Sequence, residues 1–142
     1  MATFMLEVVT PFGRFNVGPQ VSAIFTASDG AIEVLAGHEA MVVAVEPCVL
    51  RVRGESGSWT AAIGEGFARI KQTTTTLLVD SAELGPEIDV ERARAALQRA
   101  QERLLSNAPT WIRAQSRKAV ARALARIKAA GEGAGRKIVS GD

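Results

Sequence analysis

The sequence has few of the side chains that carry out chemistry near neutral pH. Its 142 residues include one cysteine, Cys48, and one histidine, His38. A lone cysteine cannot form an intramolecular disulfide and fits a reducing compartment. Neither residue stands in a spacing typical of metal ligands, and neither a G-x-S-x-G nor an H-E-x-x-H motif occurs. We therefore find no catalytic constellation and expect a protein that is not an enzyme.

Long hydrophobic runs are also missing. No stretch approaches the roughly 20 apolar residues of a membrane-spanning helix. The start, MATFMLEVVTPFG, has no basic segment followed by a long apolar one, so we expect no secretory signal peptide. The composition, 47% hydrophobic and 23% charged, is ordinary for a globular protein. We expect a soluble chain that reaches a membrane only as part of a complex.

The charges are divided unevenly along the chain. Residues 1–87 carry five basic and ten acidic side chains, whereas residues 88–142 carry twelve basic and five acidic ones. The overall formal charge of +2 hides this division. Such an asymmetry indicates two functional parts, of which the basic one seeks an anionic partner.

The first part of the chain has the pattern of short β-strands. Segments rich in Val, Ile, Phe and Thr alternate with turn residues such as Thr10-Pro11, Gly18-Pro19 and Ser28-Asp29-Gly30. The predicted strands are 4–10, 13–17, 21–26, 31–35, 41–45, 49–53, 58–63, 67–71 and 74–80. Because nothing of helical length separates them, the pattern favours an antiparallel sandwich or barrel over a parallel α/β sheet.

The second part has helical periodicity. Apolar residues recur at intervals of three and four in a first helix, at Ala93, Ala96, Leu97, Ala100 and Leu104. Pro109 interrupts the pattern, and a second helix is predicted from about Thr110 to Ala130, ended by Gly131. Its predicted apolar stripe is Ile112, Ala119, Val120, Ala123, Leu124 and Ile127.

These patterns together predict an α+β protein that is mostly β in its N-terminal part. It would be an antiparallel β-sandwich of about ten strands, followed by a C-terminal αα-hairpin. We expect residues 1–84 to form the sandwich, 85–131 the hairpin and 132–142 a flexible tail. Both helical stripes are rich in alanine, which buries little surface, so we expect the hairpin to pack closely but weakly and to be able to separate.

Basic side chains are the strongest functional signal in the hairpin. Helical spacing places two sets of three on one face each, Arg92, Arg99 and Arg103 on the first helix and Lys118, Arg122 and Arg126 on the second. Residues 110–130 hold six basic side chains and no acidic one. Like charges at i,i+4 repel each other, so the arrangement calls for an anion: an acidic protein, a nucleic acid or a phosphate ligand.

Other conspicuous residues have simpler interpretations. GEGAGRK (131–137) lacks the Gly-Lys-Ser/Thr ending of a phosphate-binding loop and follows a helix, so we interpret it as a tail. We expect Cys48 to be a small buried residue and His38 to be a surface turn residue, with a docking contact as the alternative for His38. For Trp111, at the start of the second helix, a packing anchor is the default and a partner contact the alternative.

Several fragments, in the same order along the chain, resemble the epsilon subunit of bacterial F-type ATP synthase. They are VVTPFGRF, SDGAIEVLAGHEAMVVAVEP, IGEGFARI, LLVDSAE and EIDVERA, the last similar to the I/L-D-x-x-R-A motif that opens the family's helical hairpin. The resemblance covers roughly residues 4–130. It departs at Ala36, where the family usually has proline, and at Cys48, where it usually has glycine.

The resemblance implies a non-catalytic part of the central-stalk rotor, on the cytoplasmic face of the bacterial plasma membrane. One sandwich face would pack on the gamma subunit, and one end, with Ser28, Asp29, Gly30, Gly37 and His38, would contact the c-ring. Extended, the hairpin would inhibit ATP hydrolysis by bringing basic residues to acidic loops of the alpha/beta catalytic hexamer. These residues are Arg113, Arg117, Lys118, Arg122 and Arg126.

The resemblance also implies that the folded hairpin can bind regulatory ATP, although no cofactor is required. The matching residues are Glu83, Ile88, Asp89, Arg92, Ala93, Arg99, Arg122 and Arg126. Guanidinium groups suit phosphates, and carboxylates can orient the base, the ribose or the arginines. The simpler interpretation is that Asp89 only caps a helix. The alternative function is a free-standing nucleotide sensor or a basic nucleic-acid-binding adaptor; the resemblance implies neither nucleic acid nor metal.

Overall fold

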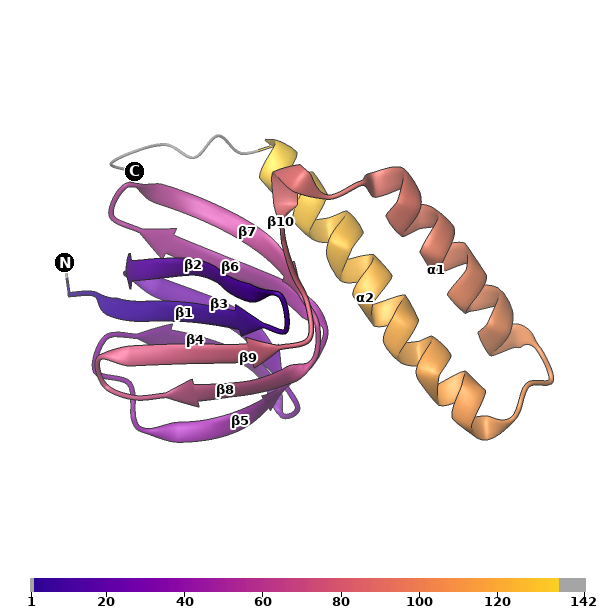
Figure 1. The fold of residues 1–142 in the computed structure, drawn as a ribbon, viewed down its shortest axis with the longest axis horizontal. Helices are drawn as coiled ribbons and strands as arrows, with labels where there is room; N and C mark the ends of the chain where they lie inside the picture. Colours follow the sequence, from indigo (N-terminus) through magenta and orange to yellow (C-terminus); the bar gives the residue numbers. More distant parts are fainter. Residues whose placement is uncertain (1, 136–142) are drawn as a thin grey trace.

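The structure, a computed structural model that describes residues 2–135, is a β-sandwich with a helical hairpin against one of its ends (Figure 1). Its strands are β1 (Phe4–Thr10), β2 (Gly13–Gln20), β3 (Ser22–Ala27), β4 (Gly30–Leu35), β5 (Met41–Val45), β6 (Cys48–Gly54), β7 (Gly57–Ile63), β8 (Gly66–Ile70), β9 (Thr74–Val79) and β10 (Ala82–Leu84). A 3₁₀ turn, η1 (Gly85–Glu87), leads to helices α1 (Val90–Leu105) and α2 (Thr110–Gly135). The nine predicted strands are all present, and only the short β10 was not expected.

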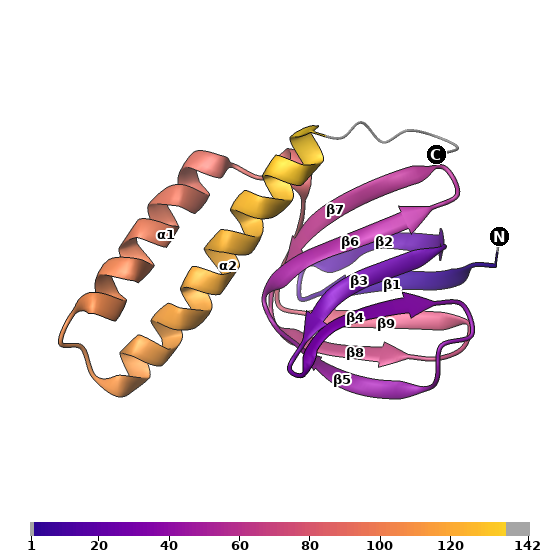
Figure 2. The same cartoon turned by 180° about the vertical axis from the view of Figure 1, so that it is seen from behind.

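The strands form two layers that meet at a corner. One layer has the order β10-β7-β6-β3-β4 and the other β5-β8-β9-β1-β2, joined where Ala27 of β3 pairs with Val45 of β5. Figure 2 shows β7, β6, β3 and β4 on the near side and β1, β2 and β9 behind them. Pairing is antiparallel except between β1 and β9, which run parallel. No hairpin turn joins these two strands, so their direction was not set by the local turn signals that favoured antiparallel pairing.

The main core lies between the two layers. On β1, buried Phe4, Leu6 and Val8 alternate with residues that point outward, the two-residue period of a strand with one buried face. They pack with the inward residues of the other strands, among them Leu50 and Leu77. Burying each large apolar side chain contributes about 1.5–3 kcal/mol. This core lies wholly within residues 4–79, so the sandwich has a core of its own.

Helix α1 begins as its sequence predicts. The Asp89 side chain accepts a hydrogen bond from the Arg92 backbone N–H at 3.1 Å and caps the helix, and Glu91 lies in the first turn. The predicted end of α2 is wrong: the helix continues through Gly131 to Gly135. Gly131 does not end the helix because the following turn is held against the sandwich, as described below. Residues 136–142 of the expected tail lie outside the described residues.

The hairpin seam is made of small residues. Ala93 and Ala100 of α1 are buried, and α1 makes its main contacts with α2. On α2, Ala123 is buried as predicted, but Leu124 is 49% exposed. Successive helix residues are rotated by about 100°, and α2 packs on α1 with one side and on the sandwich with another. Leu124 falls on the remaining side, which faces solvent.

Candidate functional site

The six basic residues of α2 fall on two different faces. Spacings of three, four and seven place Lys118, Arg122 and Arg126 on the side of Ala125 and Ala129, whose side chains pack against the sandwich. The other three, Arg113, Arg117 and Lys128, are exposed. The sequence pattern grouped the first three correctly but could not tell that this face turns toward the rest of the chain.

Two ion pairs join this face of α2 to the sandwich. Lys118 Nζ lies 3.2 Å from a carboxylate oxygen of Glu65, in the β7–β8 connection. Arg126 donates two hydrogen bonds to Glu83 of β10, from Nε at 2.7 Å and from a terminal nitrogen at 3.3 Å. The contact between Arg126 and Glu83 is bidentate, which is the stronger arrangement for a guanidinium and a carboxylate. The acidic first part of the chain thus neutralises part of the basic second part.

A third link holds the far end of α2. Arg51 of β6 donates to both carboxylate oxygens of Glu132, at 2.8 and 2.9 Å. Nearby, the Thr60 hydroxyl donates to the backbone carbonyl of Ala129 at 3.1 Å. Sequence reasoning missed these contacts, because Arg51 and Glu132 are 81 positions apart and no spacing rule relates them.

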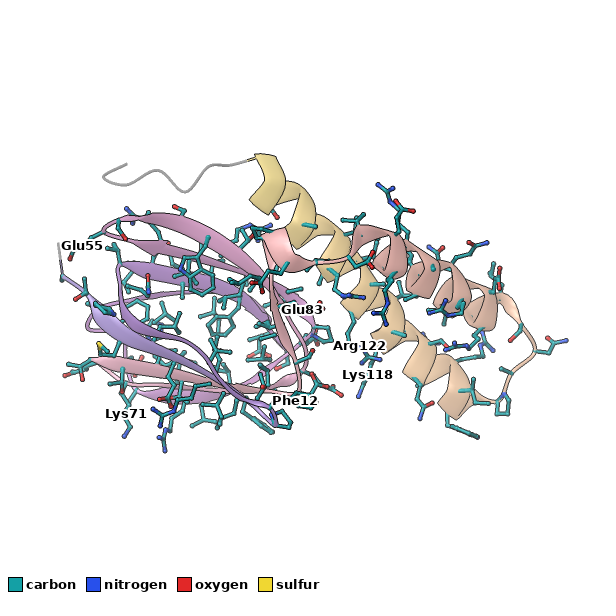
Figure 3. All side chains as sticks on the ribbon, turned by 45° about the horizontal axis from the view of Figure 1, so that its top comes forward. Phe12, Glu55, Lys71, Glu83, Lys118 and Arg122 are labelled. Carbon is teal, nitrogen blue, oxygen red and sulfur yellow. The ribbon has the colours of Figure 1, made fainter. Side chains whose placement is uncertain are left out.

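Arg122 differs from the basic residues on either side of it. It lies between Lys118 and Arg126 on the same face, it is half-buried, and it has no ion-pair partner among residues 2–135. Figure 3 shows Arg122 and Lys118 projecting from α2 on the side of the sandwich, with Glu83 near them. On α1, Arg92 and Arg99 are exposed and have no side-chain partner within the described part of the chain. These three guanidinium groups are free to bind an anion.

The remaining residues of the predicted nucleotide site have structural roles in this conformation. Ile88 is buried against Ala129 and its neighbours, Ala93 is buried in the hairpin seam, and Asp89 caps α1. The start of α1 therefore lies beside the second half of α2. The structure brings Glu83, Ile88 and Asp89 to the region of Arg126, whereas Arg99 lies almost three turns beyond Asp89 along α1.

The five predicted c-ring residues do not share one end of the sandwich, so this part of the prediction is wrong. Ser28–Gly30 join β3 to β4, whereas Gly37 and His38 follow the other end of β4. Ser28 N–H bonds to Ala44 near the end of β5, and Gly37 N–H bonds to Gln72, beyond β8. A six-residue strand spans about 20 Å, and it separates the two turns. The sequence pattern alone did not show that these two turns lie at opposite ends of β4.

Three single residues complete the comparison with the sequence. Cys48 is buried, as predicted, and its sulfur accepts a hydrogen bond from the Thr26 backbone N–H at 3.3 Å. Burial raises the pKa of this thiol above its ordinary value, and the hydrogen bond from Thr26 opposes the shift. His38 is half-buried in its turn, with Nδ1 2.8 Å from the Glu39 carbonyl. Trp111 is 64% exposed, so its interpretation as a packing anchor is wrong.

Within residues 2–135, no three His, Cys, Asp or Glu side chains gather closely enough to hold a metal ion. In the same part of the chain, no helix combines the length and the apolar character that a bilayer crossing requires. The guanidinium groups of Arg92, Arg99 and Arg122, unpaired within the same residues, can bind anions.

Family models match almost the whole chain. Residues 3–85 match the β-sandwich domain of the ATP synthase delta/epsilon chain, and residues 87–131 match the long α-helix domain of the same chain. The boundary between the two models falls within η1, where the structure passes from sandwich to hairpin.

Individual relatives agree with the family models. The ATP synthase epsilon chain of Ruminiclostridium cellulolyticum is 45% identical over 130 residues, covering 91% of this chain and 96% of its own. That of Staphylococcus haemolyticus is 34% identical over 131 residues, covering 92% and 98%. A chain in the Euglena gracilis mitochondrial ATP synthase (OSCP/F1/c-ring, rotational state 1) superposes with a TM-score of 0.79 at 25% identity, covering 92% of this chain and 82% of its own.

A more distant structure shares the fold. A chain from the central stalk and c-ring of the Tetrahymena thermophila mitochondrial ATP synthase has a TM-score of 0.65 at 16% identity. It covers 91% of this chain and 97% of its own length.

Proposed function

The chain belongs to the family of ATP synthase delta/epsilon chains, as an epsilon chain, and from this membership we propose how its two parts work. It is a non-catalytic rotor subunit of the central stalk. The membership replaces the alternative of a free-standing sensor or a nucleic-acid-binding adaptor. We place the subunit peripherally, on the cytoplasmic face of a bacterial plasma membrane, with the gamma subunit, the c-ring and the alpha/beta hexamer as partners.

The sandwich docks on the gamma subunit through the outer face of β8 and β9. Phe67 is 58% exposed and pairs directly with Leu78, which is also exposed. Leu78 is in turn the partner of Val9 on β1, so an apolar row crosses three strands. A contiguous exposed apolar surface of this kind is typical of a protein–protein interface.

Co-purification tests this docking face. Replacement of Phe67 by glutamate would place a charge in the interface, and we expect it to reduce co-purification with the gamma subunit at least tenfold. Leu105 is 89% exposed and is the last residue of α1, a helix that lies on the far side of α2 from the sandwich (Figure 1). The matched variant Leu105→Glu should leave binding unchanged, and equal losses for both variants would contradict the assignment.

Only one of the two turns predicted at the c-ring can lie at a given end of the sandwich, and we assign the contact to Ser28–Gly30. All three residues are exposed, and the Asp29 carboxylate has no side-chain partner among the described residues. Thiol cross-linking to the c-ring from Asp29→Cys, in a Cys48→Ala background, should exceed that from His38→Cys. The opposite order would move the contact to the other end.

The hairpin inhibits ATP hydrolysis when it leaves the sandwich. The observation that carries this proposal is that α2 is attached by ion pairs and small residues rather than by the sandwich core, so it can separate without unfolding the sandwich. Undocking frees Lys118 and Arg126 to join Arg113, Arg117 and Arg122 in binding acidic loops of the catalytic hexamer.

Hydrolysis by the reconstituted complex tests the inhibition. A chain that ends at Glu87 keeps the sandwich and its proposed docking face, so it should assemble with the complex but no longer inhibit. Equal inhibition by the truncated and full-length chains would show that the hairpin is not the inhibitor.

The docked hairpin binds regulatory ATP through guanidinium groups that have no ion-pair partner among residues 2–135. Arg122 lies beside the Glu83–Arg126 pair, and Arg92 and Arg99 extend the positive charge along α1. Titration calorimetry with ATP should show at least tenfold weaker binding for Arg122→Ala, because a charge-assisted contact to phosphate is lost. Arg113→Ala removes an equal charge from the solvent face of α2 and should change the affinity little. Equal effects of the two variants would remove Arg122 from the site.

A further inference from the structure

The last described turns of α2 are bound to the sandwich by hydrogen bonds, although their sequence has a low helix propensity. Arg51 holds Glu132 through two hydrogen bonds, and Thr60 holds the Ala129 carbonyl. Yet the segment 131–135 reads GEGAG, and glycine is the least favourable residue in a helix interior after proline. The contacts with the sandwich therefore compensate for a segment that has little helical stability of its own.

Gly131 has no packing reason to be glycine. A Cβ atom at this position would meet nothing within 4 Å, and no positive φ is present. Gly85, by contrast, lies so close to the Ala129 carbonyl that a Cβ atom there would approach it to 2.6 Å. The absence of a side chain at Gly131 therefore serves neither close packing nor backbone geometry, and its consequence is to weaken the helix at the place where it is anchored.

We propose that residues 129–132 of α2 form a latch that controls the release of the hairpin from the sandwich. Closed, the latch consists of the Arg51–Glu132 ion pair and the Thr60–Ala129 hydrogen bond. Unwinding of the glycine-containing turn withdraws the Glu132 carboxylate and the Ala129 carbonyl together, since both are carried by the same turn. The proposal concerns the docked state itself and does not depend on whether the released hairpin inhibits hydrolysis or binds ATP.

The rest of the interface is weak enough for one turn to matter. The apolar contact between α2 and the sandwich involves Val49 and Ala62 on the sheet and alanines on the helix. Such small residues bury little surface. All three ion pairs between α2 and the sandwich are partly exposed, and the Lys118–Glu65 pair is the most exposed of them. Arg51–Glu132 is one of two bidentate pairs that hold the hairpin down, the other being Arg126–Glu83, and it is the pair carried by the glycine-containing turn.

Thiol labelling under the helix measures release directly. Ala62 is 5% exposed and belongs to the cluster that α2 covers, so a cysteine there is labelled only when the hairpin undocks. We would introduce Ala62→Cys into a Cys48→Ala background and measure the labelling rate, which follows the open fraction when closing is fast. Circular dichroism would confirm that each variant is folded.

The latch predicts opposite changes in two variants. Arg51→Gln should raise the labelling rate about five- to tenfold, because a charge-assisted bidentate contact is lost. Gly131→Ala should lower it about fivefold, because the anchored turn becomes a better helix. The exchange Arg51→Glu with Glu132→Arg should restore a rate within about threefold of the parent, because the pair is re-formed with reversed charges.

Matched controls distinguish opening of the latch from the loss of any surface ion pair and from opening of the sandwich. Glu91→Gln breaks the Arg94–Glu91 pair, which lies on α1 and does not contact the sandwich, and should not change the rate. The native Cys48, in the chain without the Ala62 substitution, reports opening of the sandwich and should be labelled equally slowly with and without Arg51→Gln. The proposal is overturned if Gly131→Ala leaves the Ala62→Cys rate unchanged, or if Arg51→Gln and Glu91→Gln change it equally.

Discussion

Two threonines, one fully buried and one half-buried, show how the effect of a polar side chain depends on its hydrogen-bond partner. Thr75 of β9 is fully buried beside the apolar core, and its hydroxyl finds no hydrogen-bond partner among the described residues. Thr60 is chemically the same residue, but its hydroxyl bonds to Ala129. A buried polar group without a partner costs free energy, whereas a paired one contributes it. The same substitution should therefore have opposite effects at the two positions.

We expect Thr75→Val to raise the free energy of unfolding by about 1–2 kcal/mol, because it replaces an unpaired hydroxyl with a methyl group of similar size. Thr60→Val removes a hydrogen bond and should lower the stability by about 0.5–1.5 kcal/mol. Urea unfolding followed by circular dichroism measures both values. A loss of stability in Thr75→Val would mean that the hydroxyl is satisfied in solution.

The buried thiol of Cys48 makes stability depend on pH. Burial raises its pKa, so the folded chain keeps the thiol proton at pH values where the unfolded chain has lost it. Deprotonation therefore favours the unfolded state above about pH 8.5, and the contribution of Cys48 falls as the pH rises. The stability difference between the native chain and Cys48→Ala should be constant from pH 6 to 8 and shift against the native chain by pH 9.5. A constant difference throughout would show that the thiol titrates normally.

At the scale of elements, local sequence patterns predicted the type and order of the helices and strands well. They did not predict contacts between elements that are far apart in the sequence. The two-residue period of Phe4–Val8 and the capping by Asp89 are encoded within a few positions, so β1 and α1 were found. The tenth strand is three residues long and has almost no periodicity to detect. The end of α2 was predicted too early because glycine has a low helix propensity. In the structure the helix continues past Gly131, where Glu132 binds Arg51, 81 positions away.

The approach of η1 to α2 is such a long-range relation, and it can be tested with one methyl group. A Cβ atom at Gly85 would lie 2.6 Å from the Ala129 carbonyl and 2.7 Å from the Thr60 hydroxyl, so Gly85→Ala must push α2 away. We expect this variant to raise labelling of Ala62→Cys at least tenfold while the sandwich remains folded. An unchanged rate would mean that η1 moves instead of α2.

At the scale of the whole molecule, charge predicted that two parts exist but not how they fit. The acidic first part and the basic second part were visible in the sequence, and they do meet, at Glu65–Lys118 and Glu83–Arg126. The sequence pattern pointed instead to external anions, because spacing along one helix does not reveal what that face packs against. Arg122 lies between Lys118 and Arg126 and has no ion-pair partner in the described part of the chain, so the prediction of an external anion stays open at this residue.

Because the chain is divided into a sandwich and a hairpin, we expect the sandwich to fold independently. The main core contains no residue of α1 or α2, so a chain ending at Glu87 retains all of it. The truncation uncovers Val49 and Ala62, and exposing these two side chains should lower the free energy of unfolding by about 2–3 kcal/mol. We expect a single cooperative urea transition at a lower midpoint than that of the full chain. A truncated chain without a cooperative transition would show that the hairpin is part of the folding unit. In that case the sandwich would not stay intact when the hairpin is released.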